Sequence, residues 1–103
     1  SQHFPPWIAT NLGLTLCVTN RAKEARKLFA GVIAHHPDYS RAYLGLTIAN
    51  ARLGRLDDAR GAVAELLRLD PQFTIADWAR NRPYVERAVM ESLMADMRAA
   101  GLR

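Results

Sequence analysis

Between Ser40 and Phe73, mainly apolar residues recur in two consecutive stripes, each with the spacing of one face of a helix. Gly54 separates the stripes and lacks the Cβ that penalises the turn at a helix end. Pro71 cannot continue a helix and biases Asp70 away from helical angles. We therefore predict two antiparallel helices, joined at residues 53–55, whose stripes face each other. The first stripe comprises Tyr43, Leu46, Ala49, Asn50 and Leu53, and the second comprises Leu56, Ala59, Val63, Leu66 and Leu67.

The same order of residues occurs once more, 34 positions earlier in the chain. This offset places Pro37 before Pro71, Ala25 before Ala59, Leu12 before Leu46, Gly13 before Thr47 and Phe29 before Val63. The earlier copy predicts helices over about residues 6–18 and 21–35, with a turn at residues 19–20. Residues 1–5 are expected to be a disordered lead-in.

After Phe73 the period fails. Thr74 and Asp77 have the spacing of a capping box, which predicts a short helix over residues 75–80. Pro83 suits the first position of a helix and Gly101 suits its end, so we predict a last amphipathic helix over about residues 83–100. A helical stack needs a terminal element that covers the apolar face of its last repeat. We expect residues 74–103 to cap the stack in this way.

The 34-residue pattern resembles the tetratricopeptide repeat, with Tyr43, Leu46, Gly54, Ala59 and Pro71 at matching offsets. The later copy departs from the family at three places, where Thr47 replaces a glycine, Asn50 a tyrosine and Val63 a large aromatic residue. The earlier copy restores the glycine and the aromatic residue. The resemblance implies an all-α fold, a tetratricopeptide-type solenoid of helical hairpins, with repeats over residues 6–39 and 40–73 and capping helices over residues 74–103.

Composition adds limits to the partners and the compartment. The 103 residues carry 14 Lys+Arg against 10 Asp+Glu, a net charge of +4. The arginines lie singly along the predicted helices, without a basic cluster, so no nucleic-acid partner is expected. Cys17 is the only cysteine, which excludes an internal disulfide and fits a reducing compartment. With no apolar run of membrane length and no signal segment, we expect no membrane partner and a cytoplasmic protein.

No pattern of catalytic, cofactor-binding or metal-ligating residues emerges. His35 and His36 are adjacent, so their side chains leave a helix about 100° apart and cannot both ligate one ion well. Asp57 and Asp58 open a helix, where negative charge complements the helix dipole. Cys17 has no histidine nearby in sequence to activate it. We therefore expect no enzyme, no cofactor and no metal within these residues.

The tetratricopeptide resemblance also implies a concave groove lined by the first helix of each repeat. Members that grip the carboxylate of a chaperone tail use lysine and asparagine where this chain has Thr10, Leu14 and Gly45, which argues against that kind of recognition. An amphipathic helix or an adjoining domain of the same protein is the expected occupant, with Trp7, Arg41 and Arg52 as anchors; alternatively, Trp7 only packs the N-terminal edge. The groove positions are Trp7, Thr10, Leu14, Cys17 and Val18 in the first repeat, and Arg41, Leu44, Ile48, Ala51 and Arg52 in the second.

The predicted last helix carries Met90, Met94 and Met97 at helical spacing. Methionine is flexible and suits adaptable interfaces, so this line is a candidate surface for a partner helix or for a second copy in a homodimer. The alternative is that the line packs into the core beneath a capping helix.

The last half of the chain is similar to the C-terminal tail of bacterial class III adenylate or guanylate cyclases that carry tetratricopeptide arrays. The residues that match are Leu69 to Pro71, Phe73 and Thr74, Trp78, Arg82 to Tyr84, and Ala100 to Leu102. The similarity implies a non-catalytic, regulatory protein-interaction module, because the catalytic residues of such cyclases belong to a separate domain. Two further interpretations stay open, the sensor end of a transcriptional regulator and a free-standing scaffold.

Overall fold

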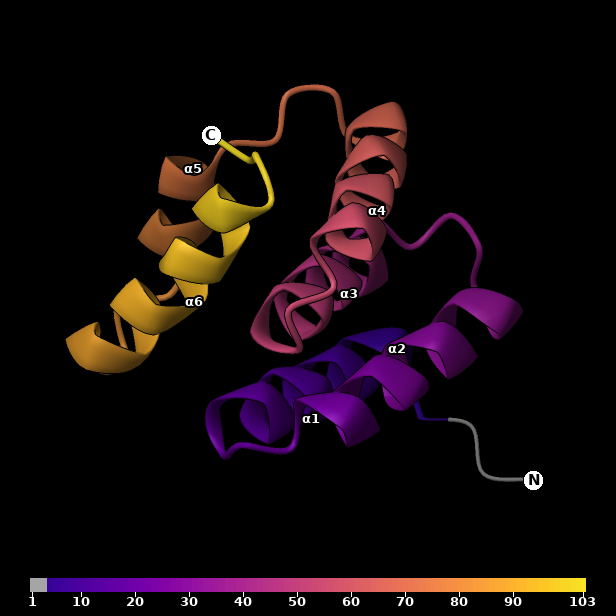
Figure 1. Cartoon of the computed structure of the whole chain (residues 1–103), viewed down its shortest axis with the longest axis horizontal. Coiled ribbons are helices and arrows are strands. Elements are labelled where there is room, and N and C mark those ends of the chain that lie inside the picture. The colour runs from indigo at the N-terminus through magenta and orange to yellow at the C-terminus, as the bar shows by residue number, and fades with distance from the viewer. Residues whose placement is uncertain (1–3) are drawn as a thin grey trace.

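The computed structural model describes residues 4–103, which form six α-helices and no strand, confirming the all-α prediction (Figure 1). The predicted lead-in lies outside the described residues at positions 1–3, and residues 4 and 5 directly precede the first helix. The helices are α1 (Pro6–Val18), α2 (Ala22–His35), α3 (Ser40–Arg52), α4 (Leu56–Leu69), α5 (Ile75–Arg80) and α6 (Arg87–Ala99).

The two predicted hairpins are present, and their connecting turns have the same backbone structure. The left-handed residue is Asn20 in the first turn, at φ 64°, and Gly54 in the second, at φ 75°. The backbone N–H of the residue directly before the second helix of each hairpin has a matching role: Arg21 donates to the carbonyl of Leu16, and Arg55 donates to that of Asn50, both at 2.8 Å. The repeat in sequence is therefore a repeat in backbone hydrogen bonding.

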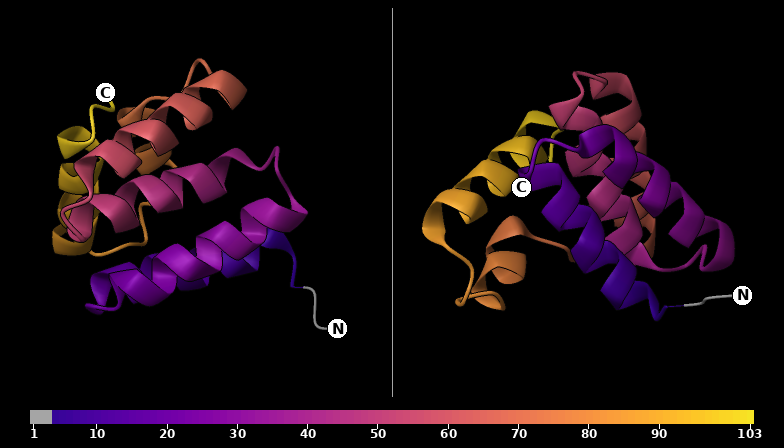
Figure 2. Two further views of the ribbon diagram at one scale, coloured as in Figure 1. Left: turned by 45° about the vertical axis from the view of Figure 1, so that its right-hand side comes forward. Right: turned by 90° about the horizontal axis from the view of Figure 1, so that it is seen from below.

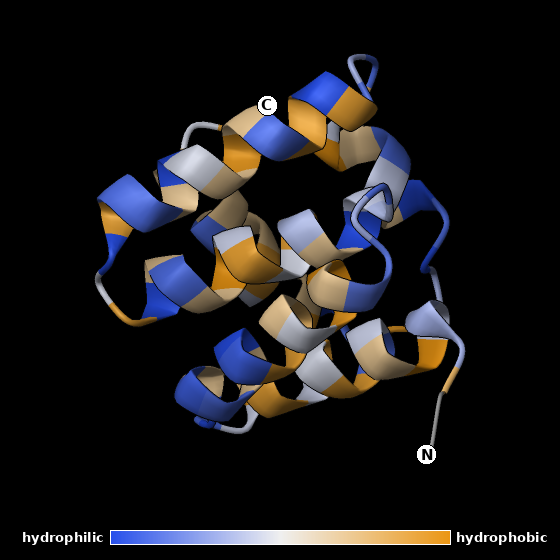
Figure 3. Cartoon of the chain, turned by 90° about the vertical axis from the view of Figure 1, so that its right-hand side faces the viewer, coloured by the Kyte–Doolittle hydropathy of each residue, from blue (hydrophilic) through white to orange (hydrophobic). Residues whose placement is uncertain are grey.

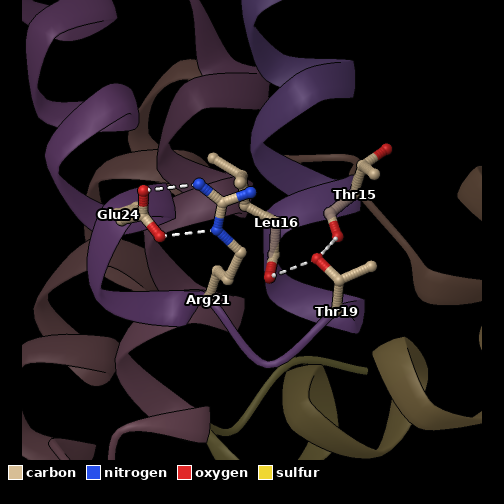
Figure 4. A network of polar contacts seen from close by, with 5 residues as sticks. All are labelled: Thr15, Leu16, Thr19, Arg21 and Glu24. Carbon is tan, nitrogen blue, oxygen red and sulfur yellow. Dashed lines mark hydrogen bonds and ion pairs between the residues drawn. The ribbon is translucent and has the colours of Figure 1, made fainter.

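Side chains reinforce the first of these turns (Figure 4). Thr19 Oγ1 donates to the carbonyl of Thr15 at 2.7 Å, and the guanidinium of Arg21 binds both carboxylate oxygens of Glu24 at 2.6 and 2.7 Å. These groups are exposed, so the ion pair contributes little to the free energy of unfolding. It does place a negative charge in the first turn of α2, where the helix dipole favours one.

The ring of Phe29 lies at the centre of the contact between α1, α2 and α3. A Cβ on Gly13 or on Gly45 would overlap this ring, so both helices need glycine to come this close. In the later repeat, Val63 takes the place of Phe29 and the fully buried Thr47 takes the place of Gly13. The two departures from the family pattern therefore compensate each other, because a smaller side chain on one helix leaves room for a larger one on the next.

Three leucines predicted in the facing stripes of α3 and α4 are more exposed than expected. Leu53, Leu56 and Leu67 are 36–37% exposed, whereas Ala59 and Leu66 are completely buried. Leu53 and Leu56 flank the turn at Gly54, where α3 ends and α4 begins. Leu67 follows the inward-pointing Leu66, and successive helical residues point about 100° apart, so both cannot face the partner helix.

The short helix α5 begins as predicted, with Thr74 Oγ1 accepting from the backbone N–H of Asp77 at 3.1 Å. The predicted start of the last helix at Pro83 is wrong, because α6 begins at Arg87. Glu86, at φ −54° and ψ 138°, is extended and forms the N-cap. Proline tolerates the first position of a helix but does not impose one, and here Pro83 belongs to a turn.

The last helix, α6, covers apolar residues of both repeats. Figure 2 shows α5 and α6 to one side of the two hairpins, and α6 packs against α3 and α1. Helix α4 exposes Asp57, Arg60 and Ala64, together with Leu56 and Leu67. The apolar surface that drives the packing of α6 belongs to α1 and α3.

Candidate functional site

The predicted groove residues of α3 form a stripe that faces α6. Leu44, Ile48 and Arg52 are spaced four residues apart and therefore lie on one side of the helix. Arg52 binds α6 directly, while Leu44 is 2% exposed and Ile48 is fully buried. On α1, Thr10 and Cys17 are also buried, and Leu14, Val18 and Ala51 are partly covered. The groove predicted for a partner is thus largely filled by the C-terminal helices of the chain itself.

Arg52 joins three helices at this place. Its Nε donates to Asp96 Oδ2 at 2.6 Å and its Nη2 donates to Ser92 Oγ at 2.5 Å, both on α6. Its Nη1 donates to the carbonyl of Cys17, on α1, at 3.1 Å. The Arg52 and Asp96 side chains are 21% and 19% exposed, so solvent screens their interaction only in part. Arg52, predicted as an anchor for a partner, anchors α6.

The environment of this junction shifts two ionisation equilibria. Burial raises the pKa of Asp96 above its usual value, although the charge and hydrogen bond of Arg52 oppose the shift. Burial likewise raises the pKa of the Cys17 thiol to about 11, again against the attraction of the Arg52 charge. A thiol with such a pKa is protonated at neutral pH and is a poor nucleophile. Cys17 is therefore a packing residue beside α6.

The methionine line of α6 points into the fold. Met97 is fully buried and Met90 is 7% exposed, while Met94 is partly buried against the same core. The expectation that these residues present a surface to a partner or to a second copy is therefore wrong for the chain as folded. An amphipathic helix buries its apolar side against whichever apolar surface it reaches, and α6 reaches α1 and α3.

Two small pockets remain between α1 and the C-terminal helices. One, of about 160 Å³, lies among α1, α3 and α5, and Trp7, which is 58% exposed, is at its rim. The other, of about 220 Å³, lies between α1 and α6. Both are lined in part by Trp78 and Arg82, which sequence reasoning did not assign to a site. Neither residue belongs to the 34-residue repeat. The only hint in the sequence was the single tryptophan of the predicted short helix.

A larger exposed surface lies on the first hairpin, which forms one edge of the molecule (Figure 3). Phe4 and Leu12 are 65% and 51% exposed. A recess of about 820 Å³ runs along this side of α1 and α2. Exposed apolar surface of this kind is a candidate interaction site. Of the thirteen residues that line the recess, seven have a counterpart 34 positions later on another surface and define the hairpin face: Ala9, Leu12, Leu16, Glu24, Lys27, Leu28 and Gly31.

The face on the first hairpin has a counterpart on the second. Adding 34 to each of its seven positions gives Tyr43, Leu46, Asn50, Asp58, Gly61, Ala62 and Glu65. Those residues line the surface where α3 and α4 meet α2, beside Lys23, Arg26, Lys27 and Ala30. The second hairpin therefore uses this face to receive a helix, and the first hairpin leaves the same face open.

Two stacked helical hairpins with an apolar inner side define a helical-repeat module that acts by binding other proteins. The tetratricopeptide repeat family matches residues 19–80, which is more than half of the chain and includes α2 to α5. The chain therefore belongs to the tetratricopeptide repeat family. No match was found among curated proteins or among solved structures. In the part of the chain that the structure describes, no helix is both long and apolar enough to cross a membrane.

Proposed function

We propose that this chain is a non-catalytic, regulatory module whose open face on the first hairpin binds a helix of an adjoining helical hairpin. The observation that carries the proposal is the 34-residue correspondence between this open face and the face that receives α2. A surface that accepts a helix in one repeat has the geometry to accept an equivalent helix in the other.

The open face sets the chemistry of its occupant. Leu16 and Leu28 stand where the covered face has Asn50 and Ala62, so the open face is the more apolar of the two. Leu12 is 51% exposed there, and a helix that covers it would remove apolar surface from water. The occupant we propose is an amphipathic helix of the α2 kind, with a small residue at the place of Ala30 and basic residues beside it.

We further propose that the module regulates an output domain of the same protein, with a class III adenylate cyclase as the first candidate. The support is the sequence similarity of the C-terminal half, from Leu69 to Leu102, to the tails of such cyclases. A transcriptional regulator and a free-standing scaffold are the alternatives. The single cysteine supports a cytoplasmic location.

A duplication experiment tests the binding face. We would place a second copy of residues 6–39 directly before Pro6, so that a second α2 can pack on the open face. We expect a higher midpoint of thermal unfolding than for the original chain, because adjacent repeats stabilise each other. Leu12→Glu in the original hairpin should abolish the gain, whereas Leu67→Glu on α4 should leave it. An unchanged midpoint would count against the proposal.

The molecular mass in solution tests whether a second copy of the chain, instead of an adjoining hairpin, occupies the same face. If the open face pairs with a second copy, light scattering should report a dimer that Leu12→Glu converts to a monomer, and the proposal of a hairpin partner would then be wrong. The output domain is tested separately by reading the coding sequence before Ser1. For a cyclase, cyclic nucleotide production should change when residues 1–103 are deleted from the full protein.

A further inference from the structure

The 160 Å³ pocket among α1, α3 and α5 is lined by two positively charged side chains. Arg41 and Arg82 both line it, and no aspartate or glutamate does. The other polar residues around it are Thr10, Asn11 and Tyr39. A small, partly buried space with two guanidinium groups and no carboxylate favours an anionic occupant.

Three residues that line this pocket each carry a buried donor without a hydrogen-bond partner among residues 4–103. The donors are the indole Nε1 of Trp78, Nη1 of Arg41 and Nε of Arg82. Trp78 as a whole is only 3% exposed. A buried donor without an acceptor destabilises a fold, and native folds rarely retain several of them in one place without a reason. Three such donors around one pocket indicate a missing acceptor.

Aromatic rings hold both guanidinium groups in place. Arg82 lies over the ring of Trp78, 4.8 Å from its centroid, and Arg41 lies over Phe73 at 5.2 Å. Arg41 Nη1 forms an ion pair with Asp70 Oδ2 at 3.6 Å, a distance longer than a hydrogen bond, so Asp70 balances part of the charge of Arg41. Stacking occupies the face of a guanidinium and leaves its edge, with the N–H groups, for an acceptor. The two arginines are therefore oriented before a ligand arrives.

The neighbouring 220 Å³ pocket is mainly apolar and shares several lining residues with the first. The two share Asn11, Leu14, Trp78 and Arg82, and the second adds Val18 and Val89 among other apolar side chains. A ligand that reaches both would carry an anionic group joined to an apolar chain. The planar pair of oxygens in a carboxylate matches the fork of a guanidinium.

We propose that these two pockets form a binding site for a carboxylate that bears an apolar group. The carboxylate oxygens accept from Arg41, Arg82 and the indole of Trp78, while the apolar group lies against Val18 and Val89. Such a carboxylate belongs either to an acidic and apolar peptide of a partner or to a short aliphatic acid. The site is separate from the open face of the first hairpin, so either proposal can fail without the other.

The indole N–H of Trp78 provides the readout. In a Trp7→Phe background, which removes the only other tryptophan, one indole N–H signal remains in the nitrogen-correlated NMR spectrum. Titration with hexanoate should move this signal saturably, because the N–H acquires an acceptor. Hexanol, which has the apolar chain but no carboxylate, should not move it. Absence of a saturable shift with hexanoate, or an equal shift with hexanol, would overturn the proposal.

Two substitutions test the charge. Arg82→Gln removes a charged donor and should weaken hexanoate binding about tenfold or more, and Arg41→Gln should do the same. Arg80→Gln is the matched control, since Arg80 pairs with Asp77 outside the pocket and should leave binding unchanged. If Arg82→Gln and Arg41→Gln both fold and bind hexanoate as well as the parent chain, the proposal is wrong.

A peptide distinguishes the two sources of the carboxylate. An acetylated peptide that ends in leucine followed by glutamate would be titrated in the same way. Tighter binding of the peptide than of hexanoate would support a partner protein as the source. Equal or weaker binding of the peptide would support a small aliphatic acid, and failure of both ligands to bind would refute the site.

Discussion

Arg52 Nε lies 2.6 Å from Asp96 Oδ2, although 44 positions separate the two residues in the chain. This contact fastens the C-terminal helix α6 into the groove that the two repeats form. A partner helix that used the same groove would have to displace α6. The chain therefore contains its own groove occupant, and a partner helix needs a surface outside the filled groove.

Loss of the Arg52 guanidinium should loosen α6. Arg52→Gln removes the donors to Asp96 and Ser92 and leaves a half-buried carboxylate without its counter-charge. We expect the free energy of unfolding to fall by about 2 kcal/mol, because uncompensated buried charge is costly. Urea unfolding measures this directly. Arg60→Gln is the control, since Arg60 pairs with the fully exposed Asp57 and should change the free energy by less than about 1 kcal/mol.

The reactivity of Cys17 should report whether α6 is in place. Burial raises the pKa of this thiol to about 11, so only about one thiol in a thousand is ionised at pH 8. We expect slow reaction with Ellman's reagent in the parent chain and faster reaction in Arg52→Gln, as α6 leaves more often. Fully unfolded protein in urea gives the upper limit of the rate. Equal rates in the two folded proteins would show that α6 does not protect Cys17.

The pKa of Asp96 predicts a specific dependence of stability on pH. Because burial raises this pKa in the folded state above the unfolded value, the folded chain binds more protons in the range between them. The contribution of Asp96 to stability is therefore complete below the unfolded pKa and is lost as pH rises through the folded pKa. Asp96→Asn should remove this loss, which urea unfolding between pH 3 and 7 would show.

Asp77 provides a comparison of opposite sign. Hydrogen bonds from Arg80 and Thr74 lower its pKa, so its contribution is present above the unfolded pKa and is lost as pH falls through the folded pKa. Asp77→Asn should therefore change the acid side of the profile in the direction opposite to Asp96→Asn. Equal changes in the two variants would contradict the assigned environments.

The contact between Phe29 and Gly45 should make that glycine irreplaceable. Alanine normally favours a helix over glycine by about 1 kcal/mol, yet a Cβ on Gly45 would overlap the Phe29 ring. We expect Gly45→Ala to lower the free energy of unfolding by about 1–3 kcal/mol. Gly61→Ala, on α4 with open space around the new Cβ, should raise it by up to about 1 kcal/mol. Equal effects of the two substitutions would show that Phe29 adapts without cost.

The local features of this chain were predictable from its sequence. Helical spacing located the first four helices, and the turn chemistry at Asn20 and Gly54 located the two hairpin turns. Thr74 was predicted as the N-cap of α5 and accepts from Asp77 as expected. Each of these features depends on residues within a few positions of one another, so the signal lies within one segment.

The tertiary structure decided which surface α6 covers and which residues surround the pockets. The apolar stripe of an amphipathic helix is satisfied by any apolar surface, so its own pattern does not say that Met97 packs towards α1 and α3. Nor does any local signal join Arg52 to Asp96, or bring Arg41 to the same pocket as Arg82. The sequence by itself determined the repeat and its helices, because those are local in origin. Only the packing of distant segments decided what fills the groove and which faces stay open.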